Sequence, residues 1–212
     1  MYAIEILEAR LPNGNEVQAQ LVYDQNASSP RECDNLGTIL IAPSKSHWVA
    51  SPDDVVDISI PFGNNPHDHW ENIRHEQLQL KKSDIALAYP ITKYEHGDIS
   101  LSLGHNSSWD CGPVGFIYVT KEQVRKCYGV NRITKSIIKH VKNCLQSELD
   151  TLTNWINGDY YGWHIKEYAH DGLDWVEVDM IDSCWGYSDQ GQALDDMKEM
   201  LSHLTKNQCE DI

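Results

Sequence analysis

The sequence predicts an α+β fold: a mostly antiparallel sheet built from hairpins, with a long amphipathic helix and a C-terminal helix packed on it. Stretches that alternate apolar and polar residues, the period of a half-buried strand, occur in pairs joined by turn residues. Two other stretches repeat apolar residues every three or four positions, as amphipathic helices do. The order strands, two helices, strands, helix favours antiparallel pairing over the strict alternation of a parallel sheet.

The N-terminal residues predict a hairpin followed by a short strand. Residues 1–11 and 16–24 alternate apolar and polar side chains, and the Pro-Asn-Gly-Asn sequence at 12–15 is typical of a tight turn. Residues 36–42, Leu-Gly-Thr-Ile-Leu-Ile-Ala, are short and apolar. We therefore expect three strands in this part of the chain.

The middle of the chain predicts a long connection and then the centre of the sheet. Residues 43–66 are rich in Ser, Pro, Asp and Gly around one strand-like run, and 67–84 has the character of a polar helix. Two strands over 85–103 are expected to bend at the Glu-His-Gly-Asp sequence of 95–98. Residues 113–120 are nearly all apolar, which is typical of a central strand.

Two helices follow this strand. Thr120 and Gln123 form a capping-box pattern that opens a short helix, and Gly129 ends it. Thr134 can cap a longer helix that runs to about residue 156. Its apolar positions have helical spacing: Ile137, Ile138, Val141, Leu145, Leu149, Leu152 and Ile156.

The C-terminal part predicts a second hairpin and a last helix. Residues 159–168 and 175–185 alternate again and are joined by the turn at 169–174. An amphipathic helix is expected over 189–204.

The 212 residues fit one domain. We expect a single α+β domain over 1–206 and a loose tail over 207–212. Within the domain, the predicted parts are N-terminal strands (1–42), a long variable connection (43–84), a motif-rich core (85–188) and the C-terminal helix (189–206).

Composition predicts a cytoplasmic protein without a membrane partner or a cofactor. No run approaches the ~18 apolar residues of a membrane span, and the first residues lack the basic and apolar regions of a signal peptide. In the cytoplasm the thiols are expected to be reduced. No two are spaced Cys-x-x-Cys, the spacing of zinc ribbons and thioredoxin-type sites: Cys33, Cys111, Cys127, Cys144, Cys184 and Cys209.

Charge is the strongest feature of the composition. The formal net charge is −15 and the isoelectric point is about 4.9, so nucleic-acid phosphates and anionic membranes repel the chain as a whole. The charge is uneven: residues 111–158 hold 7 Lys+Arg against 3 Asp+Glu (+4), and the rest holds 10 against 29 (−19). A short basic segment therefore interrupts an acidic protein.

The second hairpin carries the candidate partner-binding residues. Strand geometry predicts that Glu177 and Asp179 share one face. A row of carboxylates along the hairpin can imitate the regular phosphate charge of a nucleic acid and bind a basic partner; we call this row the acidic stripe. The alternative is that these residues form the solvated face of an amphipathic hairpin. The predicted partner-binding residues are Asp171, Asp174, Glu177, Asp179 and Asp182.

Two constellations suggest catalysis instead. His67, His69 and His75, with carboxylates nearby, offer metal ligands, although their spacing matches no standard site and a solvated polar loop is the alternative. A thiol nucleophile at Cys111 would need a base within hydrogen-bond distance. Its candidate neighbours are Asp110, His96 and His105, and the alternative is a structural turn before a strand.

The predicted long helix also has a basic face. Lys135, Lys139 and Lys142 are spaced i, i+4, i+7, so they lie together and can contact phosphate. The net charge of −15 opposes nucleic-acid binding, and a solvated helix face is the alternative.

Four segments together resemble a known family. They read SPRECDNLGTI, YEHGDISLSL, WDCGPVGFIYVTKEQVRKCYG, and DYYGWHIKEY followed by DSCWGY. In this order they resemble a widespread family of uncharacterised proteins of phages, plasmids and other mobile elements, whose members show Pro-Arg-Glu-Trp-Asp-Asn-Leu-Gly, Trp-Asp-Ser-Gly-Gln-Val-Gly-Phe-Ile-Tyr-Val and Ser-Cys-Trp-Gly-Phe motifs. The resemblance covers residues 30–187.

The chain departs from these motifs at four places. Cys33 replaces the usual Trp, Cys111 the usual Ser and Pro113 the usual Gln, and Asp98 follows Gly97 without the family's Ser before that glycine. A family with Ser at position 111 is not built around a thiol, so the departures favour a structural turn there.

The resemblance implies an accessory protein of a mobile element acting inside a bacterial cell. With the charge, it leads to the hypothesis that the chain binds and inhibits a host defence protein, a CRISPR or restriction nuclease, at its nucleic-acid-binding surface. A metal- or thiol-dependent hydrolase acting on a nucleotide or protein is the first alternative. A nucleic-acid-binding accessory is the second.

Overall fold

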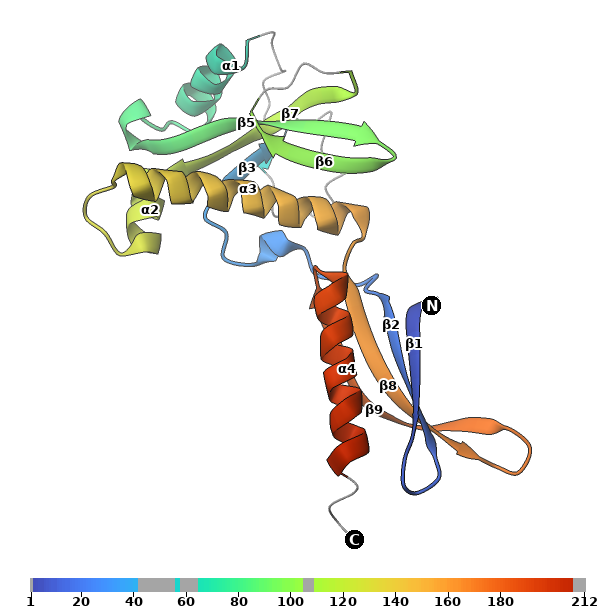
Figure 1. Ribbon diagram of the computed structural model, residues 1–212. Coiled ribbons are helices and arrows are strands. Elements are labelled where there is room, and N and C mark those ends of the chain that lie inside the picture. The colour runs from blue at the N-terminus through green and yellow to red at the C-terminus, as the bar shows by residue number, and fades with distance from the viewer. Residues whose placement is uncertain (1, 42–55, 58–64, 105–108, 208–212) are drawn as a thin grey trace. The chain divides into compact units, whose positions relative to one another are not determined.

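The computed structural model describes residues 2–41, 56–57, 65–104 and 109–207 and confirms the α+β class (Figure 1). Most strands pair antiparallel, and helix α4 (Gln190–Asn207) packs on a sheet. The strands form two sheets, and the chain divides into two compact units, 1–28 with 158–212 and 29–157, where the sequence led us to expect one domain over 1–206. The division arises because 29–157 is inserted between two strands that pair with each other.

The first unit is a four-stranded antiparallel sheet with one helix, and its strands run in the order β1-β2-β8-β9. Both predicted hairpins are present: β1 (Ala3–Arg10) with β2 (Glu16–Tyr23), and β8 (Tyr161–His170) with β9 (Trp175–Tyr187). Helix α4 covers one face of the sheet. The buried core between them consists of Leu11, Val17, Ala19, Leu21, Trp163, Ile165, Ala193 and Met197.

A carboxylate of α4 joins the helix to the sheet. The indole N–H of the buried Trp163 donates a hydrogen bond to Asp196 Oδ2 over 3.0 Å, and the Tyr187 hydroxyl donates to the same oxygen. Burial, followed by the hydrogen bond to Asp196, raises the pKa of Tyr187, which keeps this donor protonated. The Gly-Trp and Cys-Trp-Gly-Tyr motifs thus contribute to helix packing.

The second unit is a five-stranded sheet covered on both faces. Its order is β4-β3-β7-β5-β6, with β3 (Thr38–Ile41), β4 (Val56–Asp57), β5 (Ile85–His96), β6 (Asp98–Leu103) and β7 (Cys111–Thr120). Only β3 and β4 pair in parallel among these described strands. Strand β7 is central, as its apolar sequence predicted.

Two groups of helices bury this sheet. Helix α3 (Lys135–Asn157) places Val141, Leu145, Leu149 and Leu152 against one face, where α2 (Lys121–Tyr128) adds Val124. On the other face, α1 (Pro66–Asn72) and the π-helical turn Ile73–Gln77 contribute Trp70 and Ile73. Short 3-10 turns at Pro30–Glu32 and Lys82–Asp84 complete the unit.

A buried ion pair fastens the segment before β3 to α3. Arg31 Nη1 lies 3.0 Å from Glu148 Oε2, and their side chains are only 5% and 11% exposed. Glu148 also accepts the backbone N–H groups of Leu36 (2.7 Å) and Gly37 (3.2 Å). Arg31 Nη2 donates to the Gly37 carbonyl over 2.6 Å. Residues 30–32 (Pro-Arg-Glu) and 35–37 (Asn-Leu-Gly) therefore form one structural motif with Glu148.

Close packing explains the glycine of the Val-Gly-Phe motif. A Cβ on Gly115 would lie 2.0 Å from the Leu40 carbonyl oxygen, so a side chain here would force β3 away from β7. Just before the strand, Asp110 adopts a positive φ of 66°. Trp109 and Asp110 thus form the turn into the central strand, and Cys111, Gly112 and Pro113 are already part of that strand, where they pair with β5.

Replacing Glu148 with Ala should lower the free energy of unfolding by about 3–5 kcal/mol. The buried Arg31 guanidinium would lose its counter-charge, and the backbone N–H groups of Leu36 and Gly37 would lose their acceptor. Urea unfolding followed by circular dichroism measures this change. Asp150→Ala, at an exposed position of α3, is the matched control and should change stability by no more than about 0.5 kcal/mol. Equal effects of the two substitutions would contradict the assigned role of Glu148.

Candidate functional site

The negative charge of the chain is concentrated in the first unit. Residues 1–28 and 158–212 hold 17 of the 32 acidic residues but only 4 of the 17 basic ones, a formal charge of −13 out of −15. The second unit holds 13 basic and 15 acidic residues, a charge of −2. The four-stranded sheet with α4 is therefore the part of the molecule that a basic partner would be attracted to.

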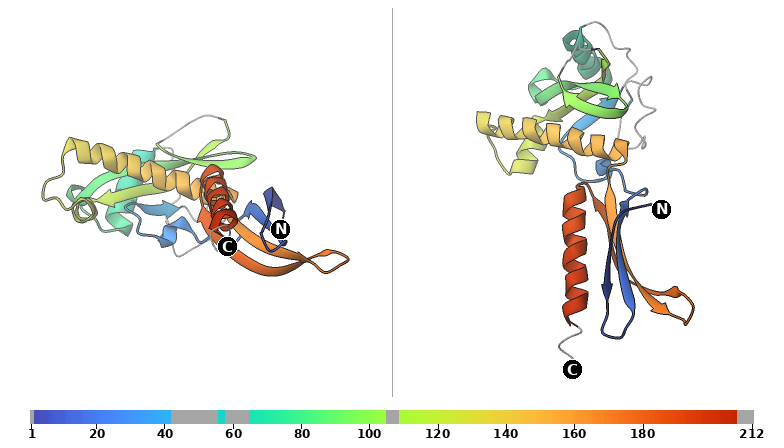
Figure 2. Two further views of the ribbon diagram at one scale, coloured as in Figure 1. Left: turned by 60° about the horizontal axis from the view of Figure 1, so that its bottom comes forward. Right: turned by 45° about the vertical axis from the view of Figure 1, so that its right-hand side comes forward.

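The β8–β9 hairpin extends beyond the rest of this sheet (Figures 1 and 2). Pairing between β2 and β8 ends at Glu16 and Tyr168, whereas β8 and β9 continue to pair through His170 and Trp175. Every residue from 171 to 180 is exposed. Residues 169–176 are therefore a two-stranded ribbon with an exposed tip, and 177–180 continue from it along β9, the edge strand of the sheet.

A β-bulge divides the predicted acidic stripe between the two faces. The register pairs Glu177 with Tyr168 and Asp179 with Glu167. Because Glu167 and Tyr168 are consecutive in β8, their partners lie on opposite faces of the sheet. The expectation that Glu177 and Asp179 share a face is therefore wrong, because one extra residue in β9 shifts the alternation.

The other predicted acidic residues have different positions. Asp182 pairs with Ile165 and therefore lies on the same face as Asp179. Asp171 and Asp174 form the turn, in which Asp171 Oδ1 accepts the N–H groups of Leu173 (2.8 Å) and Asp174 (2.9 Å). These backbone hydrogen bonds lower the pKa of Asp171.

Apolar side chains are exposed among these carboxylates. Leu173 at the tip is 87% exposed, and Val176, Val178 and Met180 along β9 are about half exposed. A mixture of exposed apolar and acidic groups on a projecting hairpin is typical of a protein-binding surface. Sequence alternation alone did not predict these residues as binding residues, because β9 reads as an amphipathic strand with a buried face.

An acidic and aromatic hollow lies at the base of the ribbon. Its volume is about 230 Å³, and it is lined by Glu8, Glu16, Val17, Gln18, Tyr168 and Trp175. The Arg10 guanidinium lies 5.9 Å from the centre of the Trp175 ring and is paired with Glu16. The Trp175 ring thus already has a cation of the chain itself beside it, and Glu8 and Glu16 give the hollow its acidic character.

The three histidines of the predicted metal site do not converge. His69 is buried and stacks on Phe116, with ring centres 6.1 Å apart, whereas His67 and His75 are exposed. In the part of the chain that the structure describes, no group of three or more His, Cys, Asp or Glu side chains is placed to hold a metal ion.

The thiol constellation is only partly assembled. His96 Nδ1 lies 3.5 Å from Asp110 Oδ2 at the surface, while Cys111 pairs with Tyr94 in the strand register. Cys111 is a free, partly buried cysteine. His105 lies outside the described residues.

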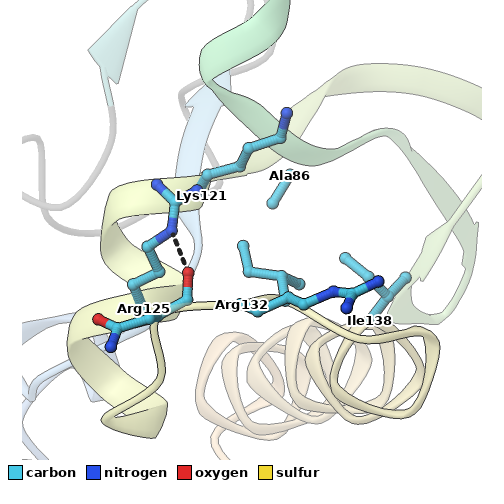
Figure 3. A pocket seen from close by; sticks show the side chains of 7 residues that line it. Ala86, Lys121, Arg125, Arg132 and Ile138 are labelled. Atoms are coloured by element: carbon cyan, nitrogen blue, oxygen red, sulfur yellow. Dashed lines mark hydrogen bonds between the residues drawn. The ribbon is translucent and has the colours of Figure 1, made fainter.

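The basic segment forms a pocket in addition to the predicted helix face. Lys135, Lys139 and Lys142 are exposed on α3, as expected. Lys121, Arg125 and Arg132, from α2 and the loop that follows it, line one hollow of the second unit (Figure 3). The sequence shows these three cations, but their place in the lining of one hollow depends on the path of the loop after α2.

Comparisons of the chain with known protein families, with curated proteins and with solved structures find no match. Among the described helices, none has the length and apolar character needed to cross a membrane.

Replacing Asp171 with Ala should accelerate amide hydrogen exchange at residues 171–174, because two turn N–H groups would lose their acceptor. Asp171→Asn is the matched control, since an Asn side-chain oxygen can accept the same bonds; exchange should then stay close to the native rate. Exchange measured by NMR tests both. Indistinguishable tip exchange in Asp171→Ala and the native protein would show that Asp171 does not order the turn.

Proposed function

We propose that this chain is an acidic binding protein that occupies the basic nucleic-acid-binding surface of another protein. The observation that carries the proposal is the position of the charge: −13 lies in one unit, whose projecting hairpin is acidic at its tip and on both faces. Such a field accelerates association with a basic groove and repels nucleic acid itself. The resemblance to mobile-element proteins suggests the partner class, a nuclease of a bacterial defence system.

The local electrostatics of the β8–β9 hairpin support a basic partner over a second copy of this chain. Asp179 lies opposite Glu167 in the register, a like-charge pair that is unfavourable in an isolated sheet. A cationic partner would relieve this repulsion. A second copy pairing along the exposed edge of β9 would increase it, because each first unit carries −13.

The apolar side chains give the contact a second component. Leu173, Val176, Val178 and Met180 would become buried when a groove of the partner covers the hairpin and the exposed side of β9, and each buried CH₂ contributes about 0.8 kcal/mol. At the hollow beside Trp175, a partner Lys or Arg side chain would contact Glu8 and the Trp175 ring in exchange for Arg10. Charge would thus bring the partner to the hairpin, and apolar contact would hold it there.

The first test compares two variants with equal charge changes. The hairpin variant carries Asp171→Asn, Asp174→Asn, Glu177→Gln and Asp179→Asn. The control variant carries four neutralising changes elsewhere in the first unit, Glu5→Gln, Asp159→Asn, Asp195→Asn and Glu199→Gln. Tagged native protein should retain a nucleic-acid-binding protein from bacterial lysate at low salt and lose it at high salt.

The hairpin variant should lose this partner, and the control should keep most of it. The retained partner should be a nuclease whose DNA cleavage is inhibited by the native protein and restored with the hairpin variant. Equal binding by both variants, or a partner without a nucleic-acid-binding surface, would contradict the proposal.

Replacing Trp175 with Ala should weaken binding of the same partner about 10- to 100-fold, because central aromatic residues dominate interface energies. Trp109→Ala, in the second unit, removes a side chain that is 86% exposed and serves as the control. Surface plasmon resonance with the retained partner gives both affinities. The hollow would have no part in binding if Trp175→Ala and Trp109→Ala gave the same dissociation constant.

A further inference from the structure

We propose that the pocket between β5, α2 and the start of α3 binds a small phosphorylated molecule. The pocket has a volume of about 420 Å³, which lies in the range of small-ligand sites. Figure 3 shows Lys121 and Arg125 on one side and Arg132 and Ile138 on the other, with Ala86 between them. Asn131 and Ile133 complete the lining.

Among the described residues, the three cations of this pocket form no ion pair with a carboxylate. No Asp or Glu oxygen of the described residues lies within 4.0 Å of the cationic nitrogens of Lys121, Arg125 or Arg132. Elsewhere Arg10, Arg31, Arg74, Lys93 and Lys166 each have an acidic partner. Three like charges around one hollow repel each other, and a bound anion would remove that repulsion.

The backbone around the pocket holds its donors in place. Arg125 Nε donates to the Asn131 carbonyl over 3.2 Å, which leaves both Nη groups available for a ligand. The Val130 N–H bonds the Arg125 carbonyl (3.1 Å), and Gly129 adopts a positive φ of 63° at the end of α2. The loop is therefore folded back against α2, and Arg132 is held on the far side of the hollow.

The local charge also favours an anion despite the −15 of the whole chain. Residues 121–142 contain seven Lys and Arg residues and one acidic residue, Glu122. The first turn of α3 contains no acidic residue, so its N-terminal N–H groups add positive potential beside Ile138. Arg and Lys together provide the bidentate and single contacts by which proteins bind phosphate.

The lining favours a small molecule over a nucleic-acid strand. Ala86, Ile133 and Ile138 give the pocket an apolar part that can contact the remainder of a phosphorylated molecule. None of the residues that line it is aromatic, so it lacks the stacking surfaces on which single-stranded nucleic acids bind. A second hollow of about 430 Å³ shares Lys121 and Arg125 but includes Asp84 and Glu122, which would repel a continuing phosphate backbone.

NMR titration of the full chain tests the assignment, with inorganic pyrophosphate, adenosine monophosphate and uncharged adenosine as probes. Pyrophosphate or the monophosphate should shift the backbone amide signals of residues 121–138, and adenosine should not. The pocket variant Lys121→Gln/Arg132→Gln should weaken binding by at least about tenfold, since two charge-assisted contacts are lost. Lys126→Gln/Lys139→Gln removes the same charge outside the pocket lining and should bind nearly as the native protein does.

Three results would overturn this inference. The first is an absence of shifts at residues 121–138 with either phosphate probe. The second is equal weakening by the two double variants, which would indicate a general charge effect. The third is tighter binding of a single-stranded oligonucleotide that both double variants weaken equally, because this would assign the surface to nucleic acid.

Discussion

The Glu148 carboxylate is the contact on which the second unit depends. It neutralises the buried guanidinium of Arg31 and accepts the backbone N–H groups of Leu36 and Gly37, so it joins the segment before β3 to α3. A Cβ on Gly37 would lie within 2.9 Å of Leu145 and Ile117 side-chain atoms, which shows how closely this segment approaches the helix. With β3 held at this position beside β7, the sheet can be buried on both faces.

In the first unit, too, a helix carboxylate joins a helix to the rest of its unit. Asp196 of α4 accepts hydrogen bonds from Trp163 and Tyr187, and this fixes the helix on one end of the sheet. The far end, residues 169–176, continues past the last pair with β2 and carries exposed side chains such as Asp171 and Leu173. The exposed residues 177–180 follow it along β9, the edge strand of the sheet. Stabilising contacts and exposed charge thus occupy different ends of one hairpin, so the charged end can be altered while the core stays intact.

Local patterns predicted most of the elements. The alternation of residues 1–24 gave the first hairpin, and Thr120 with Gln123 forms the expected capping box, with Thr120 N–H to Gln123 at 2.7 Å. The pairing of β2 with β8 could not be predicted, because it joins segments separated by more than a hundred residues and depends on the insertion of a whole unit between them.

The candidate sites were predicted less completely for the same physical reason. The acidic residues of the hairpin were identified, but their division between two faces depends on a bulge that no local pattern marks. His67 and His69 are two residues apart in sequence, yet only His69 is buried. The pocket of Lys121, Arg125 and Arg132 arises from the path of a loop, which spacing does not encode.

Competition with DNA is the measurement that tests the central claim most directly. The retained partner would be immobilised, and the apparent dissociation constant of this protein would be measured at increasing concentrations of duplex DNA. If the acidic hairpin occupies the nucleic-acid-binding surface, the apparent dissociation constant rises in proportion to the DNA concentration and no ternary complex forms. An unchanged dissociation constant, with protein and DNA bound together on the partner, would contradict the account.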